Sequence, residues 1–205
     1  MQNKNYVKIK KVFQESIQTK KKILENKFLV NLNIIAEKIY EKLSKGGKII
    51  FFGNGGSAAD AQHLAAEMLI RLRSDINRDS IPAISLTLDS SSMTAHGNDY
   101  NFNTYYERLI SSLGQKEDIL FALSTSGNSK NIIKALIKAN KKKIYTIGFL
   151  GAGGGLAIKY CDSVFVVPSK ITGRIQEVHI TAGHAVLELV EDLLIKNKKI
   201  SKLWI

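Results

Sequence analysis

Five short apolar segments, each leading into a turn rich in glycine or serine and then into a helical stretch, constrain the fold of this chain most strongly. The apolar residues within each segment are consecutive, which is typical of strands buried on both faces of a parallel sheet. The alternation predicts a doubly wound α/β fold with a five-stranded parallel sheet and right-handed crossovers. The predicted strands cover residues 48–52, 83–88, 118–123, 143–149 and 163–167. The predicted helices between and after them cover residues 58–71, 103–113, 130–140, 156–160 and 174–196.

A lysine-rich amino-terminal segment precedes this alternating region. Apolar residues recur in it at helical spacing, which predicts two helices that end at Gly46 and Gly47. A length of 205 residues is enough for one substantial core. We therefore expect a single domain over residues 1–205, with an N-terminal helical segment at 1–45 and the sheet core at 46–197.

The apolar content and the cysteine count bear on where the protein works. No stretch approaches 18 uninterrupted apolar residues, so neither a membrane span nor a membrane partner is expected. The first residues are rich in lysine and lack the apolar core and cleavage site of a secretory signal. Cys161 is the only cysteine and cannot form an internal disulfide, which favours a reducing, cytoplasmic environment.

The formal net charge of +12 raises the question of nucleic-acid binding. Only five of the 30 basic residues are arginines, the side chain that base readout and bidentate phosphate contacts favour. The lysines occur in runs such as 20–22 and 141–143, without the prominent aromatic residues that stacking on bases requires. We therefore interpret these runs as a solvated surface and expect no nucleic-acid partner, although a positive field can steer an anionic metabolite inward.

Two of the turns after strands have the composition of ligand loops. The first, at 53–57, reads Gly-Asn-Gly-Gly-Ser; its glycines suit either close approach to a ligand or simply a tight strand-to-helix connection. The turn at 124–129 reads Ser-Thr-Ser-Gly-Asn-Ser before a predicted helix start. Hydroxyls and backbone N–H groups at a helix N-terminus bind phosphate without a cation, whereas an ordinary N-cap needs one such residue. The composition favours a phosphate site.

Titratable residues at helical spacing offer a second kind of site. His63 and Glu67 are four residues apart and share a helix face, which suits a metal, proton transfer, or an ordinary surface or core pair. On the last helix, periodicity places Glu177 nearly in line with His184, and Gln176 about 80° away from it. Helical geometry alone therefore nominates Glu177 as the partner of His184. The pair at 98–99, Asn-Asp, suits either a turn or polar contacts with a substrate.

Together these motifs resemble those of the sedoheptulose-7-phosphate (phosphoheptose) isomerases, a branch of the sugar isomerase (SIS) domain proteins. The matching motifs follow the family's order and spacing over residues 46 to about 195. They lie at 53–57, 60–67, 97–99, 124–129 and 174–184.

The resemblance implies a SIS-type fold with flavodoxin-like strand order. It implies conversion of D-sedoheptulose 7-phosphate to D-glycero-D-manno-heptose 7-phosphate, the first step towards nucleotide-activated heptose for lipopolysaccharide, capsule or another glycan. It also implies a homotetramer with active sites at subunit interfaces and one zinc ion per subunit. The implied zinc ligands are His63, Glu67, Gln176 and His184, so Gln176 replaces Glu177 as the expected ligand. The implied substrate contacts are Asn54, Gly55, Gly56, Glu67, Asn98, Asp99, Ser124, Thr125, Ser126, Ser129 and Gln176.

An aldose–ketose isomerisation of this kind moves a proton between C1 and C2 through an enediol. We expect Glu67 to be the catalytic base and His184 the partnering acid, with zinc as a Lewis acid. The alternatives are a non-catalytic SIS protein of the type that binds a replication initiator, and an SIS protein for amino-sugar phosphates. The non-catalytic protein that binds a replication initiator lacks the residues that match Glu67 and His184, and this chain keeps both. Gly173, where the family commonly has Ala or Pro, is expected to loosen the loop before Gln176.

Overall fold

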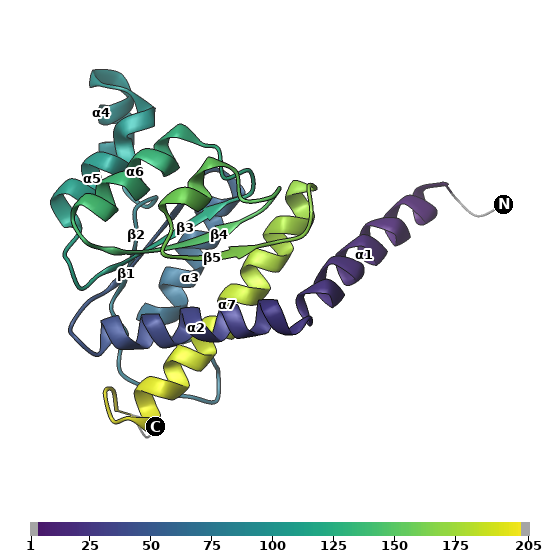
Figure 1. Ribbon diagram of the computed structural model, residues 1–205, viewed down its shortest axis with the longest axis horizontal. Helices are drawn as coiled ribbons and strands as arrows, with labels where there is room; N and C mark the ends of the chain where they lie inside the picture. Colours follow the sequence, from purple (N-terminus) through teal and green to yellow (C-terminus); the bar gives the residue numbers. More distant parts are fainter. Residues whose placement is uncertain (1–3, 202–205) are drawn as a thin grey trace.

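The computed structural model describes residues 4–201, so the ends of the predicted 1–205 domain lie outside the described residues. It confirms the predicted fold class, because all five strands pair in parallel in the order β2-β1-β3-β4-β5 (Figure 1). The strands are β1 (Ile49–Gly53), β2 (Ala83–Ser85), β3 (Ile119–Ser124), β4 (Tyr145–Leu150) and β5 (Ser163–Val166). The α-helices are α1 (Lys4–Ile23), α2 (Asn26–Leu43), α3 (Gly56–Leu69), α4 (Ser90–Asp99), α5 (Tyr105–Leu113), α6 (Lys130–Lys141) and α7 (Thr172–Lys196). Two 3₁₀ helices, η1 (Phe102–Thr104) and η2 (Leu156–Tyr160), complete the elements found within residues 4–201.

The sheet is covered by helices on both faces. Helices α2, α3 and α7 pack on one face, where they share a buried apolar cluster with β1, β3, β4 and β5 (Figure 1). Helices α5 and α6 pack on the other face and form the second cluster. Every residue of the central strands β1 and β3 is buried, which accounts for the uninterrupted apolar runs in the sequence. None of the helices within residues 4–201 combines the length and apolar character needed to cross a bilayer.

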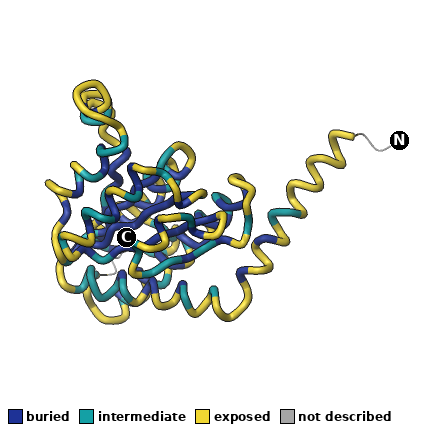
Figure 2. Tube along the Cα trace, turned by 45° about the horizontal axis from the view of Figure 1, so that its top comes forward, coloured by how far each residue is buried: buried dark blue, intermediate teal, exposed yellow. Residues whose placement is uncertain are grey.

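Helix α1 extends away from the rest of the molecule (Figures 1 and 2). Within the described chain it is anchored near its middle by a hydrogen bond of 2.7 Å from Arg174 Nη1 to the carbonyl oxygen of Val12. Most of its apolar residues remain exposed, with Ile23 at its end buried, whereas the apolar face of the amphipathic α2 is buried against α7 and β5. The exposed apolar residues of α1 are Tyr6, Val7, Ile9, Val12, Phe13 and Ile17.

The prediction was wrong in two respects on the side of the sheet near β2, at one strand end and at one missed helix. Strand β2 ends at Ser85 and not at residue 88, since the chain turns there with a hydrogen bond of 2.8 Å between the Ser85 and Thr87 hydroxyls. Helix α4 follows, in a segment for which no helix was predicted. Its sequence is mostly polar and small and therefore lacks an apolar period. The Asp89 side chain caps it by accepting from the backbone N–H groups of Ser91 and Ser92.

A fully buried histidine on α7 makes stability depend on pH. The Nε2–H group of His179 donates to the carbonyl oxygen of Leu150 at 3.2 Å. Burial lowers the pKa of His179 from 6.5 to about 4. In the unfolded chain this imidazole takes up a proton below about pH 6.5, whereas in the folded chain it stays neutral until about pH 4. Its contribution is therefore complete above pH 6.5 and is lost as the pH falls towards 4.

We expect thermal unfolding to show this loss. Between pH 6.5 and 4, wild-type stability should fall by about 3 kcal/mol more than that of His179→Gln, because about 1.4 kcal/mol accompanies each unit of pKa shift. Melting curves of the two proteins across this range measure the difference in slope. Parallel curves would contradict the assignment of a neutral, buried His179.

Candidate active site

A cavity of about 230 Å³ lies beyond the carboxyl ends of β1 and β3, where ligands bind in open parallel sheets. It brings together seven of the residues for which substrate contacts were predicted. These are Asn54, Gly56, Ser124, Thr125, Ser126, Ser129 and Gln176. Ser57, Leu123 and Thr172 complete the lining.

Three helices begin at this cavity. Gly56 is the first residue of α3, Ser129 is the N-cap of α6, and Thr172 is the first residue of α7. The first turn of each helix carries backbone N–H groups without intrahelical partners, and the positive ends of the helix dipoles meet here. The Ser129 hydroxyl makes no capping hydrogen bond, so the ordinary role of a helix-capping serine does not account for it. The residues that line the cavity include no titratable side chain, and the site is suited to an anion held by backbone and hydroxyl groups.

The loop after β3 is held in shape by its own hydroxyls and by a close backbone contact. Ser124 Oγ accepts from the N–H group of Gly127, and Ser126 Oγ accepts from that of Asn128, each at 3.1 Å. Gly127 has φ +63°, and a Cβ atom there would lie 1.9 Å from the carbonyl oxygen of Gly154. Only glycine fits this position, because the loops after β3 and β4 pack backbone against backbone.

Two side chains outside the predicted set support the loop after β1. Asn131, on α6, is buried and exchanges two side-chain hydrogen bonds of 2.9 Å with Asn54. The Tyr106 hydroxyl donates to the carbonyl oxygen of Gly53 at 2.6 Å, and burial raises the pKa of Tyr106 to about 12. Asn131 follows the Ser-Thr-Ser-Gly-Asn-Ser motif by two residues, so an extension of that motif was the available signal. The sequence offered no signal for Tyr106, because its hydrogen bond joins residues that are 53 positions apart.

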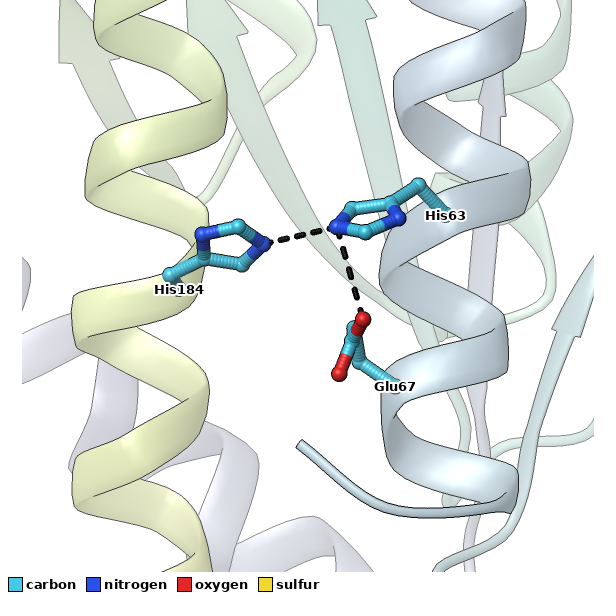
Figure 3. Close-up of side chains that lie close together, drawn as sticks. All are labelled: His63, Glu67 and His184. Atoms are coloured by element: carbon cyan, nitrogen blue, oxygen red, sulfur yellow. Dashed lines mark hydrogen bonds and ion pairs between the residues drawn. The ribbon is translucent and has the colours of Figure 1, made fainter. Parts of the chain in front are cut away.

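A second group of polar side chains lies further along α3 and α7. His63 and Glu67 come from α3 and His184 from α7, and their side chains point toward one another between the two helices (Figure 3). The two histidine Nε2 atoms are 2.9 Å apart, and His63 Nε2 is 3.5 Å from Glu67 Oε1. The structure thus brings together three of the four residues for which a metal-ligand role was predicted, His63, Glu67 and His184.

This group has the donor atoms of a metal site. One ligand atom from each of His63, Glu67 and His184 lies within 4.8 Å of the other two. Ligands of one zinc ion, each about 2.1 Å from it, lie no more than about 4.2 Å apart, so small rotations of these side chains suffice. Two imidazoles and one carboxylate form a donor set that zinc accepts, and three protein ligands leave an open position. The residues therefore fit a metal ion. Next to them, burial raises the pKa of Asp60, one turn earlier on α3.

Helices α3 and α7 run in parallel, and this sets the distance between the cavity and the three-residue group. Gly56 and Gln176 meet at the cavity, while His63 and His184, seven and eight residues further along, meet again. The helices pack closely beside the second of these points, since a Cβ atom on Gly183 would touch the Leu64 side chain at 3.0 Å. Seven residues of helix place His63 about 10 Å beyond Gly56.

Gln176 and Glu177 point to different surroundings at the start of α7. The Gln176 amide lies against Gly56, where a Cβ atom would approach its Nε2 atom to 2.4 Å. Gln176 is thus on the cavity, about 12 Å along the helix from His184, and its role as a metal ligand stays a prediction. Glu177 instead pairs with Arg174 on its own helix. Gly173 lies in the first turn of α7 and not in a loop, so the expected loosening of a loop was wrong.

Two predicted substrate contacts lie away from the cavity of their own chain. Asn98 and Asp99 form the last turn of α4, an exposed helix that projects from the body (Figure 1). The alternative of a turn at this pair was therefore wrong. The Asn98 amide donates to Asp99 Oδ1 at 2.8 Å, and Asp99 borders a different cavity, beside Tyr100 and Arg108. Gly55, at the N-cap of α3, is next to the first cavity without lining it.

Comparisons of the sequence and of the fold with known proteins point to the same group of proteins. Residues 12–151 match the family model described as the SIS domain. The chain is 42% identical over 196 residues to the phosphoheptose isomerase of Clostridium acetobutylicum, covering 95% of this chain and 98% of the relative. The structure of phosphoheptose isomerase from Neisseria gonorrhoeae superposes with a TM-score of 0.85 at 36% identity, covering 91% of this chain and 98% of the other. That from Francisella tularensis superposes with a TM-score of 0.88 at 30% identity, covering 93% and 100%.

Proposed function

The chain belongs to the phosphoheptose isomerase family of SIS-domain proteins, and from this we propose how its own residues carry out the family's reaction. The activity is that of an aldose–ketose isomerase acting on D-sedoheptulose 7-phosphate. The product is D-glycero-D-manno-heptose 7-phosphate, and we propose that it supplies nucleotide-activated heptose for lipopolysaccharide or capsule.

The observation that carries this proposal is the distance between the two polar groups. The cavity suits the phosphate, and the group formed by His63, Glu67 and His184 lies about 10 Å further along the parallel helices. In the substrate, six carbon–carbon bonds separate the reacting C1 from the phosphorylated C7, a span of roughly 8 Å at normal bond lengths. A seven-carbon sugar phosphate therefore reaches from one group to the other. Incubation with sedoheptulose 7-phosphate, followed by NMR, tests the proposal; absence of the aldose product would overturn it.

In the proposed mechanism, Glu67 removes a proton from C1 while His184 gives a proton to the C2 oxygen, which produces the enediol. His184 then takes the proton of the C1 hydroxyl, and Glu67 returns its proton to C2, which leaves an aldehyde at C1. Each residue ends in the protonation state in which it began. The two side chains lie on neighbouring helices within reach of one small molecule, which supports a shared role at C1 and C2.

We propose that zinc is the metal held by His63, Glu67 and His184, with Gln176 as the fourth, weaker ligand. Because a side chain bound to zinc is a poorer proton carrier, we propose weak binding, in which Glu67 and His184 would be free of the ion when they transfer protons. When bound, zinc supplies Lewis-acid polarisation of the sugar's carbonyl and hydroxyl oxygens. For Gln176 to reach it, the Gln176 side chain has to leave its place against Gly56, or the site has to include a second subunit. The donor set of two imidazoles and one carboxylate supports the choice of zinc.

We further propose a homotetramer with sites at subunit interfaces. Asn98 and Asp99 project on α4 away from the cavity of their own chain, so contact with substrate requires them to enter a neighbour's site. The exposed apolar residues of α1, among them Phe13 and Ile17, are suited to burial against another copy. Light scattering of the purified protein measures the oligomeric state, and a monomer with full activity would contradict this proposal.

The hydroxyls of the cavity provide a test of phosphate binding. Replacing Ser126 or Ser124 with alanine should raise KM by roughly tenfold and leave kcat nearly unchanged, because the phosphate is held in the ground state and in the transition state alike. Steady-state kinetics measures both constants, with Ser111→Ala on α5 as the control for an exposed serine. A fall in kcat alone would show that these hydroxyls do not anchor the phosphate.

A further inference from the structure

A buried arginine closes the end of the helix that carries Glu67. Helix α3 ends at Leu69, and the guanidinium of Arg78 lies against its last turn. Arg78 Nη2 donates to the carbonyl oxygen of Glu67 at 2.9 Å, and Nη1 donates to that of Met68 at 2.8 Å. These carbonyls belong to the last turn, where intrahelical donors are lacking. A cation there also interacts favourably with the negative end of the helix dipole.

The same arginine is tied to the helix that carries His184. Arg78 Nε donates to Glu191 Oε1 at 2.7 Å, and both side chains are fully buried. Glu191 follows His184 by seven residues on α7, nearly two turns, so both residues face α3. The hydrogen bonds of the Arg78 guanidinium to the Glu67 carbonyl and to the Glu191 carboxylate therefore connect the two helices of the candidate active site.

A second arginine shares Glu191 without touching α3 carbonyls. Arg73 Nε donates to Glu191 Oε2 at 2.7 Å, and its Nη2 pairs with Asp192. Both oxygens of the fully buried carboxylate thus have charged donors. Only the Arg78 arm continues to the backbone of Glu67, which separates the two arginines in function.

From this geometry we infer that Arg78, held by Glu191, is a positioning residue that fixes the Glu67 carboxylate relative to His63 and His184. Helix ends fray when their carbonyls are unsatisfied, and Glu67 is only two residues from the end of α3. A displacement of about 1 Å at a reacting group can lower the rate by about 10²-fold. Residues that orient metal ligands have comparable effects, typically 10–100-fold in metal affinity or activity. The inference rests on the proposed role of Glu67.

The test compares Arg78→Lys with Arg73→Gln. Lysine keeps the positive charge beside Glu191 but cannot form the fork to two carbonyls. We expect Arg78→Lys to lower kcat at least tenfold with little change in KM, and to weaken zinc binding at least tenfold in competition with a chromophoric chelator. Arg73→Gln, which breaks the other arm of the same ion-pair network, should stay within about twofold of the wild type in both measurements.

Two further variants separate positioning from stability. The double variant Arg78→Met/Glu191→Met replaces the buried pair by apolar groups, a change that often leaves stability intact, and it should show the same losses as Arg78→Lys. This variant decides the question if the single variant does not fold. Asp118→Asn breaks an ion pair between the buried Asp118 and Lys48, just before β3 and β1, that involves no residue of α3 or α7, and it reports the effect of lost stability alone.

The inference is overturned if folded Arg78→Lys, or the folded double variant, matches Arg73→Gln in kcat and zinc affinity. It is also overturned if Asp118→Asn, at equal loss of melting temperature, lowers both as much. Glu67→Gln in the same series distinguishes failure of the positioning role of Arg78 from failure of the proposed function. Full turnover in Glu67→Gln would overturn both. A large loss in Glu67→Gln together with normal Arg78→Lys would overturn the positioning role alone.

Discussion

Glu67→Gln is expected to leave a folded protein that turns over sedoheptulose 7-phosphate at least ~10²-fold more slowly than the wild type, the usual scale for losing a positioned acid or base. Glutamine keeps the size of the side chain but cannot accept the C1 proton. It also removes the charge of one proposed metal ligand, so both proposed roles of Glu67 are lost. Kinetics followed by NMR of the aldose measures the effect.

Two further variants show whether the loss of turnover is specific to the proposed acid–base pair. His184→Asn removes the partnering acid from α7 and should produce a loss of similar size. Glu37→Gln changes an exposed carboxylate on α2 and should leave kcat unchanged. Near-normal turnover by Glu67→Gln in a correctly folded oligomer would remove Glu67 from the mechanism, whatever the result with His184.

Removal of the metal is expected to abolish activity and to leave the fold largely intact. The core consists of the two apolar clusters on either face of the sheet, and none of His63, Glu67 and His184 belongs to them. Dialysis against a chelator should therefore produce an inactive protein with an unchanged circular dichroism spectrum. Zinc added back should restore turnover, and His63→Ala should lower the metal content found by elemental analysis.

The opposite result is equally informative. A preparation shown to be metal-free and yet fully active would contradict the zinc proposal and would leave Glu67 and His184 as a metal-independent acid–base pair. Magnesium added in place of zinc serves as the control for non-specific ionic effects, because magnesium prefers oxygen ligands to imidazole.

Much of the fold was predictable because its strands are buried on both faces. The runs of β1, β3 and β4 are apolar at nearly every position, and their predicted limits differ from the observed ones by one or two residues. Helix α4 was missed for the opposite reason: its residues are polar and small, and it depends on the Asp89 cap. An aspartate followed by three serines was the local signal for it. The division into a helical segment and a sheet core stays a prediction.

The candidate site was predictable in part. The motif at 124–129 led to the cavity, and the spacing of His63 and Glu67 led to two of the three residues of the second group. Helical periodicity alone favoured Glu177 as the partner of His184, and the first turn of α7 is indeed helical. Glu177 nevertheless pairs with Arg174, because a nearby guanidinium competes for its carboxylate. Contacts between residues more than 100 positions apart, such as His63 with His184, follow only from the packing of α3 against α7.

The convergence of three helix N-termini at the cavity has a consequence for how the enzyme responds to acidity. A phosphate site made from lysines or histidines titrates, whereas peptide dipoles and hydroxyls carry the same partial charges at any pH in the working range. The lining of this cavity contains no group of the first kind. The binding of the phosphate group in this cavity should consequently change with pH only as the phosphate itself ionises, near pH 6. The pH profile of kcat then isolates the ionisations of the acid–base groups, free of any contribution from the anchor.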